Sequence, residues 1–284
     1  MNTSSSVLAP SPASSPWLQR LLSLVRLDLV LALRHKLVHV TLIVAAVFGA
    51  LLAFALPEQL ATPELLAPEG LSPLSPTVLQ PGASKPPFNA SWIPILFTVD
   101  LCILGHMFAA VMVLQDKEQG LIQLYRVSPG GAAAYVGSKL IVGLSLTLLN
   151  LLVLVGLAYP RGLAEPWLYA LVLLTCGGMT LLGIGLAVPF RSFAQYFYPL
   201  ALVGLLAAAP MFLALNPSAP LEWTWWLPTY HVLFGGEALL FEAGAGALDS
   251  ELVRTALRYE LVFFLGAAAF AGALVHTRLL KERA

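Results

Sequence analysis

Hydrophobic and polar positions along this chain alternate in long blocks rather than at short periods. Apolar blocks almost free of charge occupy residues 37–56, 92–114, 140–159, 167–188, 197–215 and 259–276. At a rise of about 1.5 Å per residue, about 20 helical residues cross the hydrocarbon core of a bilayer. The pattern therefore predicts an all-α polytopic membrane protein with six transmembrane helices.

The start of the chain has a different pattern. Residues 1–16 are rich in Ser, Pro and Ala, which predicts a disordered tail, and residues 17–284 then form a single transmembrane domain. From Trp17 to Lys36, leucines recur at helical spacing while Arg20, Arg26 and Arg34 interrupt them. This mixture is typical of an amphipathic helix that lies in the membrane interface.

A second irregular region lies before the last apolar block. Trp223, Trp225 and Trp226 form an aromatic belt of the kind found at a membrane surface. The run 227–241 that follows is broken by glycines and by Glu237. It is too polar for a full span, so we expect a re-entrant helical hairpin on the outer face.

Composition agrees with a membrane protein. The chain is 58% hydrophobic and 11% charged, its net charge is +0, and its mean hydropathy is +0.83. Soluble domains carry about a quarter charged residues. The neutral balance gives no reason to expect nucleic-acid binding. The two cysteines lie inside apolar blocks, and His35 and His39 lack a third ligand, so neither a disulfide nor a metal site is predicted.

Positive charges gather on one side of the predicted membrane. With six spans, one side carries Arg20, Arg26, Arg34, Lys36, Lys117, Arg126, Lys139, Arg191, Arg278, Lys281 and Arg283, and the other carries Lys85, Arg161, Arg254 and Arg258. Cytoplasmic loops are enriched in Lys and Arg. Both termini are therefore expected in the cytoplasm.

A few polar side chains fall inside or close to the predicted spans. Asp100 and His106 lie in the second, Asn150 lies in the third, and Glu237 lies in the predicted hairpin. Polar groups at membrane depth face protein or water. They either line a substrate path or make structural hydrogen bonds, and the sequence leaves both interpretations open.

The segment 115–140 links the second and third spans and is the most informative polar stretch. Leu121, Leu124, Tyr125 and Ser128 fall at helical spacing. Pro129 and the two glycines after it end that helix. The pattern predicts a short amphipathic helix at the membrane surface, placed where it can pass a force from a soluble partner to two spans.

This segment resembles the first cytoplasmic loop of type-2 ABC exporter permeases. The resemblance rests on Glu118, Gly120, the helix 121–125, the Ser128-Pro129 pair and Lys139 before the next span. The amphipathic start and the short outer helices after Leu227-Pro228 are also similar to that family. Asp28 and Arg34 resemble its drug-exporting branch, which is associated with fluoroquinolones.

The resemblance implies a permease subunit in the plasma membrane that exports a drug-like amphipathic compound or a lipid. A separate cytoplasmic ATPase would bind ATP and Mg²⁺, and a second permease chain, identical or homologous, would complete the assembly. The implied ATPase-coupling residues are Glu118, Gly120, Leu121, Leu124, Tyr125, Arg126, Ser128, Pro129 and Lys139.

The chain lacks motifs for chemistry of its own. Neither a G-x-x-x-x-G-K-[ST] loop nor an H-E-x-x-H or G-x-S-x-G motif occurs, so we do not expect an enzyme. One alternative is a proton-coupled secondary transporter that uses Asp100 and His106. Another is a membrane-embedded enzyme or an assembly factor that transports nothing.

Overall fold

A computed structural model describes residues 16–34, 37–50, 93–96, 98, 104–127, 131–158, 160–215, 222–241 and 250–280. These residues lie in helices and the turns between them, without a strand, as the apolar blocks predict. The predicted disordered tail lies almost wholly outside the described residues. The α-helices are α1 (Pro16–Arg34), α2 (Leu37–Ala50), α4 (Ile93–Leu96), α5 (Leu104–Glu118), α6 (Ile122–Val127), α7 (Gly131–Ala158), α8 (Pro166–Ala187), α9 (Phe193–Leu215), α10 (Pro228–Phe241) and α11 (Glu251–Leu274).

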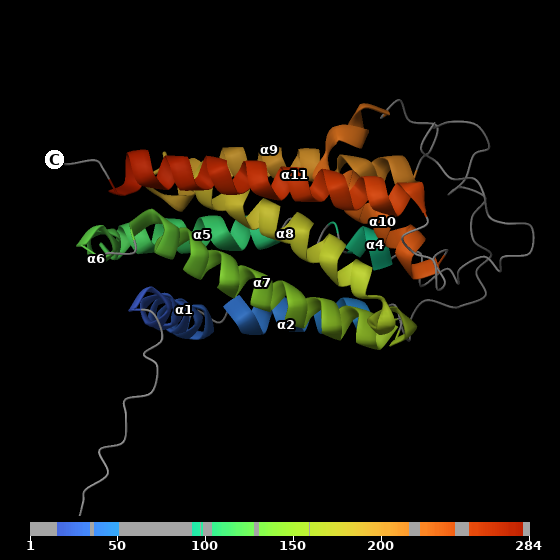
Figure 1. The fold of residues 1–284 in the computed structure, drawn as a ribbon, viewed down its shortest axis with the longest axis horizontal. Coiled ribbons are helices and arrows are strands. Elements are labelled where there is room, and N and C mark those ends of the chain that lie inside the picture. The colour runs from blue at the N-terminus through green and yellow to red at the C-terminus, as the bar shows by residue number, and fades with distance from the viewer. Residues whose placement is uncertain are drawn as a thin grey trace, which may run out of the picture.

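The helices form a bundle whose long helices run along one axis (Figure 1). Helix α8 lies in the middle and packs against α5, α7, α10 and α11, while α1 and α2 pack against α7. The short helix α6, α1 and the C-terminal end of α11 lie at one end of the bundle (Figure 1). Helix α10 and the start of α11 lie at the opposite end. The short helices α6 and α10 therefore lie at opposite ends of the bundle.

Four described helices are long and apolar enough to cross a membrane: Gly131–Ala158, Pro166–Ala187, Phe193–Phe212 and Glu251–Arg278. They correspond to the third, fourth, fifth and sixth predicted spans. The third and sixth begin earlier than predicted, because regular helix continues into the polar flanks. Helices α1 and α2 meet at 66° and pass the same test only as a pair, which fits either a broken span or a re-entrant loop.

The first two predicted spans are only partly described. Helix α2 covers the first part of block 37–56, and α4 and α5 cover parts of block 92–114. The residues between α2 and α4, and most of those between α4 and α5, lie outside the described ranges. The count of six spans therefore stays a prediction, whereas the all-helical, multi-pass character agrees with the sequence.

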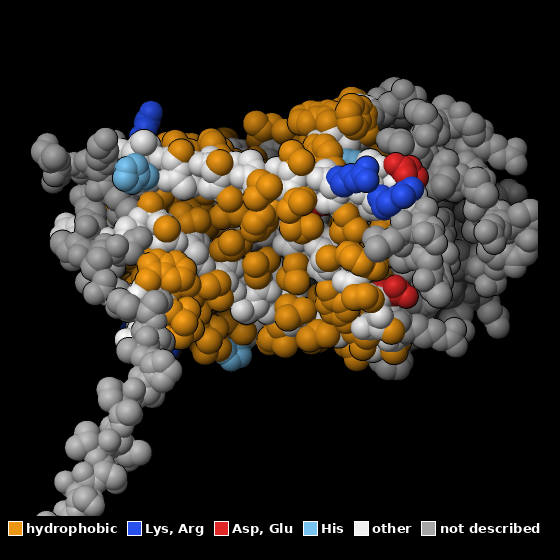
Figure 2. Space-filling model, in the orientation of Figure 1, with side chains coloured by type: hydrophobic (Ala, Val, Ile, Leu, Met, Phe, Trp, Pro, Cys, Tyr) orange, Lys and Arg blue, Asp and Glu red, His pale blue; other side chains and the backbone are white. Residues whose placement is uncertain are grey.

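The described surface is apolar around the middle of the bundle. Hydrophobic side chains cover the visible middle face, and the visible Lys, Arg, Asp and Glu lie toward the ends (Figure 2). Tyr198 on α9 and Val262 on α11 expose 79% and 71% of their surface, respectively. Such exposure is costly in water and favourable in lipid. The surface therefore suits a bilayer.

Glycines allow close packing around α8. A Cβ added to Gly183 would overlap the backbone of α5 at the His106 carbonyl, and one added to Gly178 would overlap the Phe263 ring of α11. Small residues let membrane helices approach closely. These positions hold α5 and α11 against α8.

The region of the predicted hairpin contains a 3-10 turn, Glu222–Trp226, and then α10. His231 stacks on Tyr259 at 4.1 Å between ring centroids, whereas a Cβ on Gly235 would lie 3.0 Å from that of Ala256. Helix α10 therefore runs antiparallel to α11. Residues 216–221 and 242–249 lie outside the described ranges, so the re-entrant hairpin stays a prediction.

Candidate functional site

The short helix predicted from segment 115–140 is present as α6. Gly120 in the turn before α6 has φ 70° and Gly131 at the start of α7 has φ 52°, values that glycine adopts without strain. On α6, Ile122 and Tyr125 are buried against the bundle and Gln123 is exposed, and Glu118 at the end of α5 is exposed as well. Helix α6 therefore buries one side in the bundle and exposes Gln123 on the other.

Not every residue of the predicted coupling loop can be placed. Ser128 and Pro129 lie outside the described residues, as do the side chains of Leu124 and Arg126. Leu121 is half-buried in the turn before α6, next to the buried Ile122, which the sequence analysis did not single out. The helix is confirmed, and its role in coupling stays a prediction.

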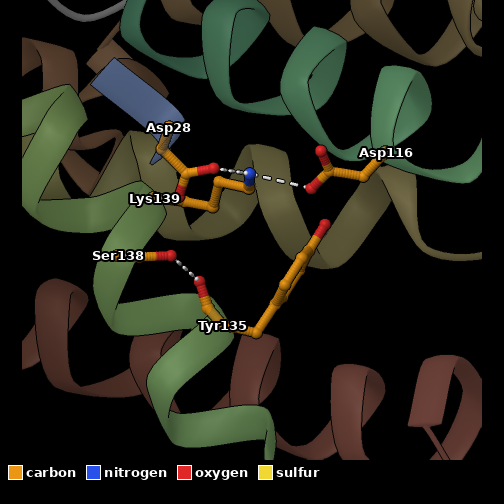
Figure 3. A network of polar contacts seen from close by, with 5 residues as sticks. All are labelled: Asp28, Asp116, Tyr135, Ser138 and Lys139. Carbon is orange, nitrogen blue, oxygen red and sulfur yellow. Dashed lines mark hydrogen bonds and ion pairs between the residues drawn. The ribbon is translucent and has the colours of Figure 1, made fainter. Parts of the chain in front are cut away.

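Next to α6 lies a buried ion cluster, defined by Asp28, Asp116 and Lys139 (Figure 3). The Lys139 Nζ atom is 2.5 Å from Asp28 Oδ1 and 2.8 Å from Asp116 Oδ2. All three residues are buried. They come from α1, α7 and the end of α5, so the cluster ties three helices together at one point.

Two tyrosine rings complete the surroundings of the Lys139 ammonium group. Its Nζ lies 5.9 Å from the ring centroid of Tyr125 on α6 and 5.3 Å from that of Tyr135 on α7. The two rings meet edge to face at 4.6 Å. The Tyr135 hydroxyl points toward Asp116 (Figure 3). Cation–π contacts of this kind stabilise a charge that has left water. Through Tyr125, α6 therefore touches the ion cluster directly.

The ion cluster has two carboxyl groups for one ammonium group. Burial raises the pKa of Asp116, although the charge of Lys139 opposes that shift. Burial also raises the pKa of the Tyr125 hydroxyl, and the two carboxylates add to the effect, so this phenol stays neutral. A cavity of about 10 Å³, lined in part by Gln115, Asp116 and Lys139, borders the cluster. The stability of this ion cluster therefore depends on the balance between its two carboxyl groups and its one ammonium group.

Lys117 links α5 to a further helix. Its Nζ donates hydrogen bonds of 3.2, 2.5 and 2.7 Å to the carbonyl oxygens of Ala187, Val188 and Phe190 at the end of α8. The last carbonyls of a helix lack intrahelical donors, and a cation there is favourable. Asp116 and Lys117 together therefore connect the end of α5 to α1, α7 and α8.

His106 has structural partners. Its Nδ1 lies 3.3 Å from the Met179 carbonyl of α8, and its Nε2 lies 2.7 Å from the Tyr196 hydroxyl of α9. It is buried and joins three helices. Its partner in the predicted substrate path, Asp100, lies outside the described residues.

The two remaining predicted path residues lie on other helices. Asn150 is buried in α7 and Glu237 is half-buried in α10. The structure gives a position for each of them. The substrate path stays a prediction.

Sequence reasoning did not find the cluster as a unit. Lys139 and Asp28 were noticed only through the resemblance, and Asp116 and Tyr135 were missed. A signal was present: Asp28 falls on the same helical stripe as Leu21 and Ala32, which are both buried. An acidic residue on an apolar stripe must either pair with a cation or hold a proton.

Comparison with family models, with curated proteins and with solved structures finds no match.

Proposed function

We propose that this chain is the permease subunit of an ATP-driven exporter and that α6 is the docking helix for a separate ATPase subunit. The observation that carries the proposal is the contact between α6 and the ion cluster through Tyr125. A short helix that follows a glycine turn can be moved by a partner. A buried charge cluster beside it can pass that movement on without losing its shape.

The transmission has two routes, one that begins on α6 and one that begins at the end of α5. The first runs from Tyr125 to Lys139 and from there to Asp28, so a shift of α6 displaces α7 and α1. The second runs through Lys117 to the end of α8. Because separating buried charges is costly, the helices are expected to move as a unit. An ATPase drives this change only if it binds one permease conformation better than the other.

The end of the bundle that holds α6 faces the cytoplasm in this proposal, and both termini lie there. Two permease chains, identical or homologous, would pair with two ATPase chains that hold ATP and Mg²⁺. The exported compound would be an amphipathic drug-like molecule or a lipid. The apolar surface of α9 and α11 agrees with a chain that works inside a bilayer.

A proton-coupled carrier centred on Asp100 and His106 is the less favoured alternative. Such a carrier needs a histidine that is free to exchange protons. Both ring nitrogens of His106 already lie within hydrogen-bond distance of Met179 or Tyr196. A structural role is therefore the better account of this residue.

Co-purification tests the proposal. The tagged chain is isolated in mild detergent from its native host, and the proteins that accompany it are identified by mass spectrometry. We expect an ATPase subunit at a near one-to-one ratio, and we expect Glu118→Lys to remove it without lowering the amount of permease in the membrane.

The matched control is Glu251→Lys, because Glu251 is also exposed but begins α11 at the other end of the bundle. This variant should keep the ATPase. A permease that purifies alone, or that loses its partner equally in both variants, would refute the assignment of α6.

A further inference from the structure

One charged residue lies on the stripe by which α11 is buried. The buried residues of α11 are Val253, Ala256, Glu260, Ala267 and Ala271. Glu260 is 0% exposed and lies about 14 Å from the start of α11, inside the segment that can cross a membrane. The other members of the stripe are small and apolar. Glu260 is therefore not explained by packing.

The carboxyl group of Glu260 has no hydrogen-bond partner among the described residues. The Thr175 hydroxyl of α8 lies near it, but that hydroxyl donates its one proton to the Leu171 carbonyl at 2.9 Å. Thr175 can then only accept a hydrogen bond on the side of Glu260. Two acceptors repel, so this geometry suits a carboxylic acid and not a carboxylate.

No described cation balances Glu260. The titratable groups on the helices packed against α11 are Tyr169 and Cys176 of α8 and Tyr230, His231 and Glu237 of α10. On α11 itself the Tyr259 hydroxyl donates to the Trp226 carbonyl, Arg254 pairs with Glu251, and Arg258 is exposed. Lys139 of α7 is held by the ion cluster. Burying an ionised carboxylate without a partner costs several kcal/mol. In this conformation Glu260 therefore holds a proton.

Helix α10 covers this part of α11 and shares a hydrophobic core cluster with it. Helix α10 lies against α11 through Gly235 on Ala256 and through the ring of His231 on that of Tyr259. Separation of α10 would admit water to Glu260, which would then ionise. The carboxylate would be left beside two aromatic rings and apolar helices.

Those surroundings select the kind of ligand. Metal cations such as Ca²⁺ and Mg²⁺ need about six oxygen ligands, and among the described residues no group of three His, Cys, Asp or Glu side chains lies close enough to hold a metal. A hydrophobic organic cation needs one carboxylate and aromatic faces.

We propose that Glu260 is a proton-exchange site for hydrophobic organic cations. It holds a proton while α10 is packed, and it releases that proton to water when a cation takes its place. That hydrophobic organic cations are the exported substrates rests on the proposed export function. Their binding at Glu260 does not depend on that function.

The test uses the full-length permease in detergent without any ATPase, so its failure is separate from failure of the exporter assignment. Tetraphenylphosphonium is the probe, and the anion tetraphenylborate is the control of similar size and shape. Calorimetry in buffers of different ionisation enthalpy measures binding and proton release together. We expect about one proton released per cation bound, with affinity rising roughly tenfold per pH unit while Glu260 is protonated.

Variants locate the site. Glu260→Gln imitates the neutral acid, so it should fold normally, lose proton release and bind the cation at least about tenfold more weakly. Glu251→Gln on the exposed start of α11 should behave as wild type. The His231→Gln variant should still release a proton when it binds the cation. That result would exclude His231 as the source of the proton.

Three results would overturn the proposal. They are the absence of tetraphenylphosphonium binding to the wild type, binding without proton release, and equal affinity in Glu260→Gln. Equal binding of tetraphenylborate and tetraphenylphosphonium would also overturn it, because a site selected by a carboxylate must prefer the cation.

Discussion

Replacement of Lys139 by Met is the perturbation that the structure resolves best. Methionine keeps most of the side-chain length and removes the ammonium group, which lies 2.5 Å from Asp28 and 2.8 Å from Asp116. Two buried carboxyl groups then lose their only cation among the described residues. Breaking a buried ion pair in this way costs about 3–5 kcal/mol, because an uncompensated charge remains. The contacts with the Tyr125 and Tyr135 rings add roughly 0.5–1 kcal/mol each.

A compensating variant distinguishes charge balance from simple loss of contacts. In the triple variant Asp28→Asn/Asp116→Asn/Lys139→Met, neutral amides replace both carboxyl groups. The cost of unpaired buried charge therefore disappears. Replacing a buried ion cluster by neutral groups of similar volume is often close to neutral in stability. The triple variant should therefore be several kcal/mol more stable than Lys139→Met alone.

The assay is the free energy of unfolding of the purified chain in mixed detergent micelles, measured by denaturant titration for the wild type, the single variant and the triple variant. Lys139→Arg, which keeps the charge, serves as the control and should fall between the wild type and Lys139→Met. Equal destabilisation of the single and triple variants would refute the reasoning, since it would mean that the pairing of charge contributes nothing.

Three further predictions follow from individual contacts. Gly183→Ala should lower thermal stability because its Cβ would overlap the His106 carbonyl, whereas Gly266→Ala, with nothing within 4 Å, should not; thermal melting of the two variants compares them. Tyr196→Phe removes the hydroxyl that lies 2.7 Å from His106 and should cost about 0.5–1.5 kcal/mol in denaturant unfolding while transport in vesicles persists; loss of transport at normal stability would contradict a structural role. Because burial raises the pKa of Asp116, the folded chain binds this proton more tightly than the unfolded chain, so the contribution to stability is present at low pH and is lost as pH rises through the raised pKa. Asp116→Asn should flatten that pH dependence, and an unchanged pH profile would show that another group causes it.

The hydrophobic pattern predicts the middle of each long helix but not its ends. The block that begins at 167 predicts α8 to within a residue, because Pro166 and the apolar boundary coincide. The block that begins at 259 misses the first turns of α11, where Arg254 and Glu251 form an exposed ion pair on a regular helix. Hydropathy reports the lipid-crossing part of a helix, and the backbone continues beyond it. Glu260 is the second residue of the block 259–276, yet it lies more than two turns inside α11 and is buried.

The candidate site was only partly predictable. Helix α6 follows from local signals, namely helical spacing and the proline and glycines that end it. The ion cluster brings together Asp28 and Lys139, which are 111 residues apart, and no periodicity connects them. Its pairing depends on how α1, α5 and α7 pack. A buried charge can be noticed in a sequence, but its partner is found only in the folded chain.

Site-specific photo-crosslinking from α6 tests the central claim most directly. A photoreactive amino acid at Gln123, which is exposed on α6, is activated in living cells. The same amino acid at Trp223, which is exposed in the 3-10 turn before α10, serves as the control. The account predicts a crosslink from position 123 to an ATPase subunit and none from position 223. A crosslink to an ATPase from position 223 alone, or from neither position, would contradict the proposal that α6 couples this chain to ATP hydrolysis.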